Sequence, residues 1–280
     1  MTQLNAVETL RDHTLRDHTE FDRATALQPV SGEPGVFAVD LSGEWSSLIG
    51  IHGGYMAAIT VRGAEAVAVG RGTRTTTTNF LRPGQPGPAR LEVREFRRSR
   101  SISTVIADLV QGPSVLMTSR VTLTTDRTGV EWATPDRIPL PPPEECIPLD
   151  PPPGNHHLAR LDALLDPSTV PFTGGDLARI RGWFRPFDSR TIDARWLTMA
   201  VDWFPPPAFI RIAPPTGGIS IDLVSHLHQP HVELAEDEWL AGEFGIDTST
   251  SGLAVEHGRI SRMDGTLVGE SFHTRWTAEG

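Results

Sequence analysis

Hydrophobic and polar positions along the chain follow two periodicities. Apolar and polar residues alternate in stretches such as Thr104-Val-Ile-Ala-Asp-Leu-Val110, and this alternation predicts half-buried strands. An alanine-rich run that opens at His52-Gly-Gly54 has the small residues of a tightly buried helix. In the first half, these patterns predict strands before and after that helix, at residues 35–47, 73–81, 90–98, 101–111 and 115–125.

The second half repeats this order of elements. Two short segments support the repeat, because Phe80-Leu-Arg-Pro83 and Leu227-His-Gln-Pro230 each end the first strand after a helix. One helix wrapped by an antiparallel sheet, made twice, predicts a duplicated α+β fold. The expected elements are a helix over residues 193–204 and strands at residues 177–187, 218–228, 239–247, 252–262 and 266–277.

A proline-rich stretch at residues 135–154 separates the two halves. Proline removes backbone donors and is excluded from helix interiors and central strands, so this stretch is predicted to be a linker. A chain of 280 residues is long enough for two such units. We therefore predict an N-terminal lead-in over residues 1–34, a first repeat over 35–134, the linker over 135–154, and a second repeat over 155–280.

Composition narrows the class of protein. The net charge of -10 argues against broad nucleic-acid binding, which needs a basic face. The single cysteine, Cys146, cannot form an intrachain disulfide, which suits a reducing compartment. No apolar run approaches the ~18 residues of a membrane span, and the N-terminus lacks the features of a signal peptide. We expect a cytoplasmic protein.

Five short motifs resemble a known family. They occur in order over most of residues 35–277, and together they are similar to the acyl-CoA thioesterase II type of hydrolase, whose fold is a double hotdog. The resemblance implies two tandem hotdog repeats, each with a long helix wrapped by an antiparallel sheet. The motifs are His52-Gly-Gly54, Asn79-Phe-Leu-Arg-Pro-Gly84, Ala200-Val-Asp-Trp-Phe204, Ser220-Ile-Asp222 and Leu267-Val-Gly-Glu-Ser-Phe-His273.

The resemblance also implies a site. The family holds its hydrolytic water with an aspartate on the second helix, a hydroxyl residue on the next strand and a glutamine on the last strand. By position, the aspartate corresponds to Asp202 and the hydroxyl to Ser220, while His273 departs from the pattern because it stands in the glutamine position. The implied substrate is an acyl-CoA of fatty acid metabolism, and no metal or redox cofactor is implied.

These groups suit thioester hydrolysis. A thioester carbonyl is reactive enough for direct attack by a well-placed water, so no covalent nucleophile is needed. The apolar stretch around Asp202 is expected to strengthen it as a base, and Ser220 can bond to the same water. A neutral His273 offers one donor and one acceptor, as an amide does. His273 could instead take the proton itself, and hydrolysis would then fall off at acid pH with an imidazole-like titration.

Residues at the start of the first helix are predicted to bind substrate. The backbone amides of Gly53 and Gly54 suit the developing oxyanion, and in a hotdog pair they would face Asp202 across the pseudo-twofold axis. His52 could contact substrate there or only fix the loop by a hydrogen bond. Trp203, next to Asp202, is the candidate for a wall of the substrate tunnel.

Structural roles remain open for several of these residues. Asp202 could cap its helix or pair with Arg195 or Arg211, and His273 could be an ordinary strand histidine. Four arginines at a strand turn could meet the phosphates of CoA or lie solvated: Arg94, Arg97, Arg98 and Arg100.

Metal binding is not favoured at either histidine group. His13 and His18 are five residues apart, which does not place them on one helical face. His226 and His228 lie on one face of a predicted strand with Asp222, but a further well-placed ligand is not evident.

Two other functions stay open. A hotdog enoyl-CoA hydratase would use an acidic residue and a histidine, here Glu44 and His52, but the Asn-Pro expected between them is missing. A non-catalytic binder of acyl-CoA or acyl-carrier protein would keep the tunnel without the chemistry. A serine esterase is disfavoured because there is no Gly-x-Ser-x-Gly segment. Pairing of sheet edges between copies is compatible with a homo-oligomer.

Overall fold

The secondary structure of the first half is a single long helix among strands. The computed structural model describes residues 19–126, 129–187, 191–211, 218–235 and 237–277. The N-terminal repeat with His13 and His18 lies outside the described residues. The elements of the first half are α2 (Glu20–Ala24), β1 (Gln28–Pro29), β2 (Val36–Leu41), η1 (Gly43–Trp45), β3 (Ser46–Ser47), β4 (Gly50–Ile51), α3 (Gly53–Val67), β5 (Gly72–Phe80), β6 (Gly87–Arg98), β7 (Ile102–Gln111) and β8 (Ser114–Thr124).

The second half follows the same plan with more short elements. They are η2 (Pro143–Glu145), β9 (Ile147–Pro148), η3 (His156–Arg160), β10 (Leu161–Leu165), η4 (Pro167–Thr169), β11 (Ala178–Pro186), β12 (Ile192–Asp193), α4 (Ala194–Ala200), η5 (Pro207–Ile210), β13 (Ile219–Leu227), β14 (His231–Val232), β15 (Leu240–Thr250), β16 (Leu253–Arg262) and β17 (Leu267–Trp276).

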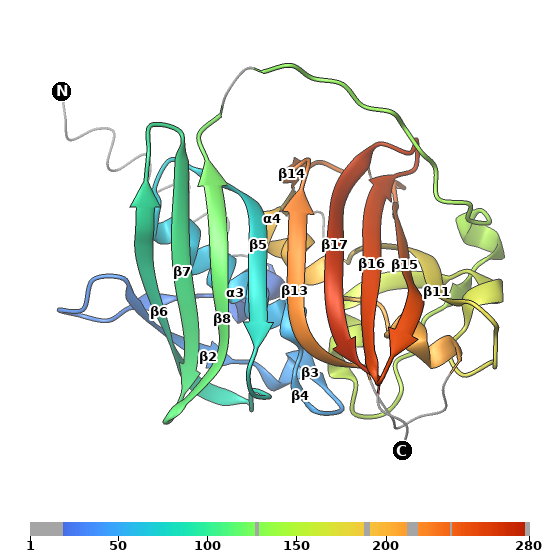
Figure 1. Ribbon diagram of the computed structural model, residues 1–280, viewed down its shortest axis with the longest axis horizontal. Coiled ribbons are helices and arrows are strands. Elements are labelled where there is room, and N and C mark those ends of the chain that lie inside the picture. The colour runs from blue at the N-terminus through green and yellow to red at the C-terminus, as the bar shows by residue number, and fades with distance from the viewer. Residues whose placement is uncertain (1–18, 127–128, 188–190, 212–217, 236, 278–280) are drawn as a thin grey trace.

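One antiparallel sheet runs through both halves, with α3 and α4 on one face of it (Figure 1). Its strand order is β1-β2-β6-β7-β8-β5-β13-β17-β16-β15-β11-β10-β9. The halves join where β5 pairs with β13, from Asp222 opposite Asn79 to His226 opposite Thr75. The buried hydroxyls of Thr76 and Ser225 also bond across this seam at 2.6 Å. The sheet is therefore continuous from one half to the other.

The alternating patterns located most strands correctly. The segment predicted as one strand over residues 35–47 is the exception, because β2 ends at Leu41 and the chain then turns. Ser42 caps that turn by accepting a hydrogen bond from the backbone of Glu44. The short strands β9 and β10 were not predicted, since two and five residues are too few to show a period.

Only one of the two helices, α3, fits the expectation of a long helix in each half. Helix α3 matches the prediction, but α4 ends at Ala200 and not at residue 204. Asp202 and Trp203 donate to the carbonyls of Met199 and Ala200 in tight turns, and Pro205 cannot continue a helix. No helix in the described part of the chain is long and apolar enough to cross a membrane.

Glycine at the start of α3 allows α3 and α4 to approach closely. A Cβ atom at Gly54 would lie 2.7 Å from the carbonyl oxygen of Met199 and 3.0 Å from Cβ of Asp202. Farther along α3, Ala57, Ala58 and Ala64 are fully buried in the core. The small side chains therefore bring the start of α3 against the end of α4.

Candidate active site

Asp202 lies in the turn after α4 and is almost fully buried, with 6% of its surface exposed. Its Oδ2 atom accepts a hydrogen bond of 2.8 Å from the backbone N–H of Gly54. Its Oδ1 atom lies 3.1 Å from Nη2 of Arg275 on β17. Both oxygens are thus held, one by the first half and one by the second, and the carboxylate cannot rotate freely.

His52 caps the start of α3 and also contacts Asp202. Its Nδ1 atom accepts from the backbone N–H of Tyr55 at 3.2 Å. Nε2 then carries the proton and donates to the backbone carbonyl of Asp202 at 2.9 Å. Burial lowers the pKa of His52 to about 4, so the ring is neutral near pH 7. In the structure, His52 fixes the turn that carries the carboxylate.

A second histidine, His157 from η3, stacks on His52 with ring centres 4.3 Å apart and planes 11° apart. Burial lowers its pKa to about 3, and its Nδ1 bonds to the carbonyl of Ser46 at 3.2 Å. Trp203 is fully buried and packs edge-on against both rings, at 6.2 Å from His52 and 5.3 Å from His157. Trp203 therefore packs against both histidine rings next to Asp202.

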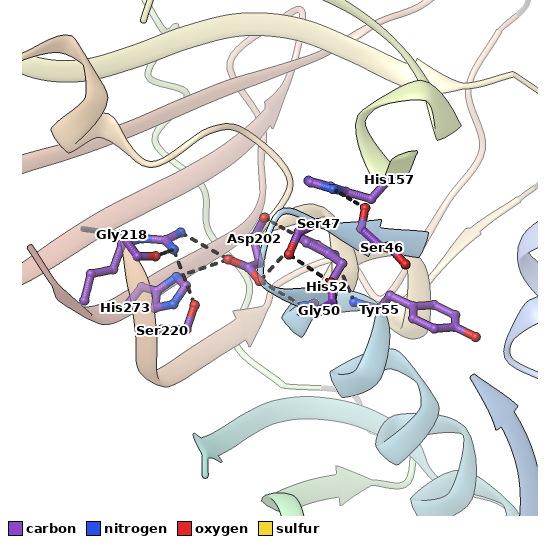
Figure 2. Close-up of polar contacts among 12 residues, drawn as sticks. Ser46, Ser47, Gly50, His52, Tyr55, His157, Asp202, Gly218, Ser220 and His273 are labelled. Atoms are coloured by element: carbon purple, nitrogen blue, oxygen red, sulfur yellow. Dashed lines mark hydrogen bonds and ion pairs between the residues drawn. The ribbon is translucent and has the colours of Figure 1, made fainter. Parts of the chain in front are cut away.

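His273 points at Asp202 from β17, on the side opposite His52 (Figure 2). It is fully buried, and its Nδ1 lies 3.4 Å from Oδ1 of Asp202. Neither ring nitrogen has a hydrogen-bond partner among the described residues. Burial, together with the charge of Arg275, lowers the pKa of His273 to about 3. The imidazole-like titration near neutral pH that the sequence left open is not supported.

Ser220 reaches the same cluster through Arg275. Its Oγ atom accepts from Nη1 of Arg275 at 3.4 Å, and the same nitrogen donates to the carbonyl of Gly218 at 3.2 Å. The register of β13 against β17 shifts between Ser220 and Asp222, so that Ser220 lies opposite Arg275 and Asp222 lies opposite Thr274. Figure 2 shows Ser220 beside His273, on the far side of Asp202 from His52.

The two glycines at the start of α3 have different roles in the structure. The N–H of Gly54 already donates to Asp202, so it is not free to stabilise an oxyanion. The N–H of Gly53 has no hydrogen-bond partner among the described residues. A Cβ atom at Gly53 would lie 3.0 Å from Oδ2 of Asp202 and 2.9 Å from the ring of Phe80. Of the two predicted donors, Gly53 is therefore the one available.

Three residues of this cluster were not predicted. Arg275 follows His273 by two positions on one strand, so the alternation of strand side chains places both on the same face. Glu256 on β16 binds Nε of Arg275 at 2.6 Å. Glu256 and His157 could not be found from motifs, because only strand register and tertiary packing bring them to Asp202. The predicted structural partner Arg195 instead pairs with Asp22 and Asp193.

The arginine cluster predicted for CoA phosphates lies on the other face of the sheet. Arg94 and Arg97 line an open groove of about 440 Å³ with Arg120. Alternate residues of β6, such as Val93, point instead into the core. Arg98 pairs with Glu95 at 3.3 Å. The sheet separates this groove from Asp202, so these arginines do not lie beside the candidate site.

No group of three or more histidine, cysteine, aspartate or glutamate side chains is placed to hold a metal within the part of the chain that the structure describes. His226 and Asp222 lie on the strand that forms the seam, opposite Thr75 and Asn79. His228 binds Glu270 at 3.0 Å.

Comparison with protein families identifies two adjacent domains. The acyl-CoA thioesterase N-terminal domain matches residues 41–124, and the acyl-CoA thioesterase C-terminal domain matches residues 143–276. A search of curated proteins finds no match. The second match begins inside the predicted linker.

Solved structures share the fold. A protein of unknown function with a hotdog fold from Alicyclobacillus acidocaldarius has a TM-score of 0.83 at 20% identity, covering 94% of this chain and 99% of that one. An acyl-CoA thioesterase II from Mycobacterium marinum has a TM-score of 0.73 at 18% identity, covering 94% and 98%. A TesB protein from Mycobacterium avium subsp. paratuberculosis has a TM-score of 0.74 at 19% identity, covering 93% and 99%. The hotdog fold is therefore confirmed.

Proposed function

The chain belongs to the acyl-CoA thioesterase family, and from this premise we propose that it hydrolyses acyl-CoA thioesters to the free acid and CoA with a directly activated water. The observation that carries the proposal is the buried Asp202 carboxylate, held by Gly54 and Arg275 beside a neutral His273 whose ring nitrogens have no partner among the described residues. A base and an orienting group thus lie next to each other in a buried site.

In the proposed mechanism, Asp202 and His273 hold the water, and Ser220 contributes a hydroxyl from the neighbouring strand. The water oxygen bonds to the thioester carbon while Asp202 takes its proton. The N–H of Gly53 donates to the oxyanion of the tetrahedral intermediate. The carbon–sulfur bond then breaks, and the CoA thiolate takes up the proton. His52 and Trp203 form the wall on the other side of Asp202 and contact the substrate.

We propose the same division of the chain that the sequence indicates, with hotdog repeats over residues 35–134 and 155–280, a lead-in over 1–34 and a linker over 135–154. In support, the strands of the two halves pair with each other at β5 and β13 in the described sheet, and each half contributes a helix to one face of that sheet. The strand β9 inside the linker pairs with β10 of the second half. A cytoplasmic location and association of copies stay predictions.

The test is thiol release from a panel of acyl-CoA substrates by the wild type and by Asp202→Asn. We expect the variant to lose roughly 10²-fold or more in kcat, the order expected when general-base help is removed. The matched control is Asp247→Asn, because Asp247 is an exposed aspartate of the same half. If Asp202→Asn hydrolyses acyl-CoA as fast as the wild type, Asp202 is not the base.

The same panel separates the other functions. Tight binding of acyl-CoA without thiol release would identify a non-catalytic binder. Loss of the conjugated double bond of enoyl-CoA would identify a hydratase. The structure gives no support to a hydratase, because Glu44 is largely exposed and pairs with Arg160 at 2.5 Å.

A further inference from the structure

Arg275 lies between two buried carboxylates. Its Nε atom donates to Oε2 of Glu256 at 2.6 Å, and its Nη2 atom donates to Oδ1 of Asp202 at 3.1 Å. Its Nη1 atom reaches Ser220 Oγ at 3.4 Å. Arg275 is 3% exposed and Glu256 is 1% exposed. One guanidinium therefore fixes both the proposed base and the proposed hydroxyl partner.

The ion cluster is poorly explained by stability alone. Taking charges out of water is costly, and a well-packed apolar pair is often at least as stable as a buried ion pair. Desolvation raises the pKa of Glu256, and the charge and hydrogen bond of Arg275 oppose that rise. Burying Arg275 and Glu256 thus costs free energy, and the two groups are buried where Arg275 contacts Asp202.

The other titratable groups that face Asp202 are neutral near pH 7. They are His52 at the start of α3, His157 on η3 and His273 on β17. Burial lowers the pKa of His52 to about 4 and the pKa of both His157 and His273 to about 3. Arg275 from β17 and Glu256 from β16 are then the charged groups that act on Asp202 within the described part of the chain. The electrostatics of the carboxylate depend on this pair.

We propose that Arg275 is a positioning residue for the hydrolysis proposed above: it fixes the orientation of the Asp202 carboxylate and of Ser220, while Glu256 holds Arg275 and shares its charge. The N–H of Gly54 binds Oδ2 of Asp202 and Arg275 binds Oδ1, so both oxygens of the carboxylate are held. Glu256 also balances part of the positive charge that Arg275 brings to Asp202. This inference rests on the proposed function.

The first experiment replaces the ion pair with an apolar pair, Glu256→Leu with Arg275→Met, so that Glu256 is not left buried without its cation, while Asp202 keeps the hydrogen bond from Gly54. We expect the double variant to fold, with kcat reduced by about 10²-fold and KM changed by less than about 3-fold, because a misplaced base affects chemistry more than binding. The matched control is Glu243→Leu with Arg259→Met, an ion pair on the outer face of β15 and β16. A folded Glu256/Arg275 variant with kcat close to that of the control would overturn the proposal.

The second experiment uses Glu256→Gln, which keeps the size and the acceptor oxygen but removes the charge. The full charge of Arg275 then acts on Asp202, so the acid limb of the kcat profile should move to lower pH. In the Glu256→Leu/Arg275→Met double variant it should move to higher pH. A role limited to stability would not produce opposite shifts.

The third measurement does not need turnover. The amide proton of Gly54 is bonded to Asp202, so its NMR chemical shift reports the protonation of that carboxylate. Its titration midpoint should move to lower pH in Glu256→Gln and to higher pH in the double variant. Unchanged midpoints would overturn the role of Arg275. If wild type releases no thiol from any acyl-CoA, the proposed function fails, and this titration still decides whether Arg275 controls Asp202.

Discussion

The start of α3 and the start of α4 are built from different residues. Helix α3 begins with two glycines, and the N–H of Gly54 reaches the carboxylate of Asp202. Helix α4 begins with Ala194 and Arg195, and the Arg195 side chain binds Asp22 at 2.8 Å and Asp193 at 2.5 Å. The backbone at the start of α3 thus binds a carboxylate directly, whereas the start of α4 is occupied by the ion pairs of Arg195 with Asp22 and Asp193.

The residues that face the two helix starts differ as well. Counted from the caps His52 and Asp193, the residue of α3 that corresponds to Asp202 is Val61, which is fully buried in the core. Glu65 lies close enough to Arg195 to interact with its charge. The two helices therefore begin in different surroundings, and under the proposed function one helix start takes part in the chemistry while the ion cluster at the other contributes to stability.

The largest expected effect comes from adding a methyl group at the glycine start. Gly54→Ala would place Cβ against the backbone of Met199 and against Asp202, and so would separate α3 from the carboxylate. We expect turnover to fall by about 10²-fold, with a lower unfolding temperature. Ala194→Gly, at the first position of α4, is the control and should change turnover by less than about 3-fold, although it costs about 1 kcal/mol of stability. Equal turnover in both variants would remove the distinction between the helix starts.

An intermediate effect is expected on stability alone at the start of α4. Arg195→Met removes the cation that lies between Asp22 and Asp193, and breaking a buried pair in this way costs about 3 kcal/mol. Urea unfolding should report this loss, whereas kcat of the folded enzyme should stay within about 3-fold of wild type. Adding Asp22→Leu should restore part of the stability. A large loss of kcat would show that this helix start also takes part in the chemistry.

The smallest expected effect is a pH-dependent gain from Glu65→Gln. Desolvation raises the pKa of Glu65 above its ordinary 4.5, and hydrogen bonds from Thr73 oppose the rise. A carboxyl with a raised pKa in the folded state costs stability once pH rises above its unfolded value, because only the unfolded chain ionises it easily. Glu65→Gln should therefore raise the unfolding temperature at pH 7 and leave it unchanged below about pH 4. The same gain at all pH values would exclude this cause.

Local patterns in the sequence account for much of the fold. The alternation over β7 and the alanine run of α3 gave elements close to the observed ones, because each depends on which face of a single element is buried. The predicted end of the second helix at residue 204 stands directly before Pro205, Pro206 and Pro207, whereas the observed α4 ends at Ala200 and continues in tight turns. The prediction was wrong at this end because a proline run marks where a helix can no longer continue and not where its last turn ends.

Only some of the residues of the candidate site could be predicted from the sequence. Motif order placed Asp202, Ser220 and His273 together, and the structure brings all three to one cluster. Glu256 could not be found in this way, because it reaches the cluster through the register of β16 with β17, where it lies opposite His273. The interaction of Gly54 with Asp202 joins residues 148 positions apart and depends on the packing of α3 against α4. Contacts between residues so far apart in the chain produce no periodic pattern in the local sequence.

The seam between β5 and β13 has a consequence for assembly. Because the two hotdog units are covalently joined and share one sheet, Gly54 and Asp202 are held at an effective concentration that does not change on dilution. Their stoichiometry is fixed at one to one in every molecule. In a dimer of identical subunits, each substitution would occur at both symmetry-related positions. In this chain the two positions can carry different residues, so one can hold the ion cluster of Arg195 while the other faces the buried carboxylate of Asp202.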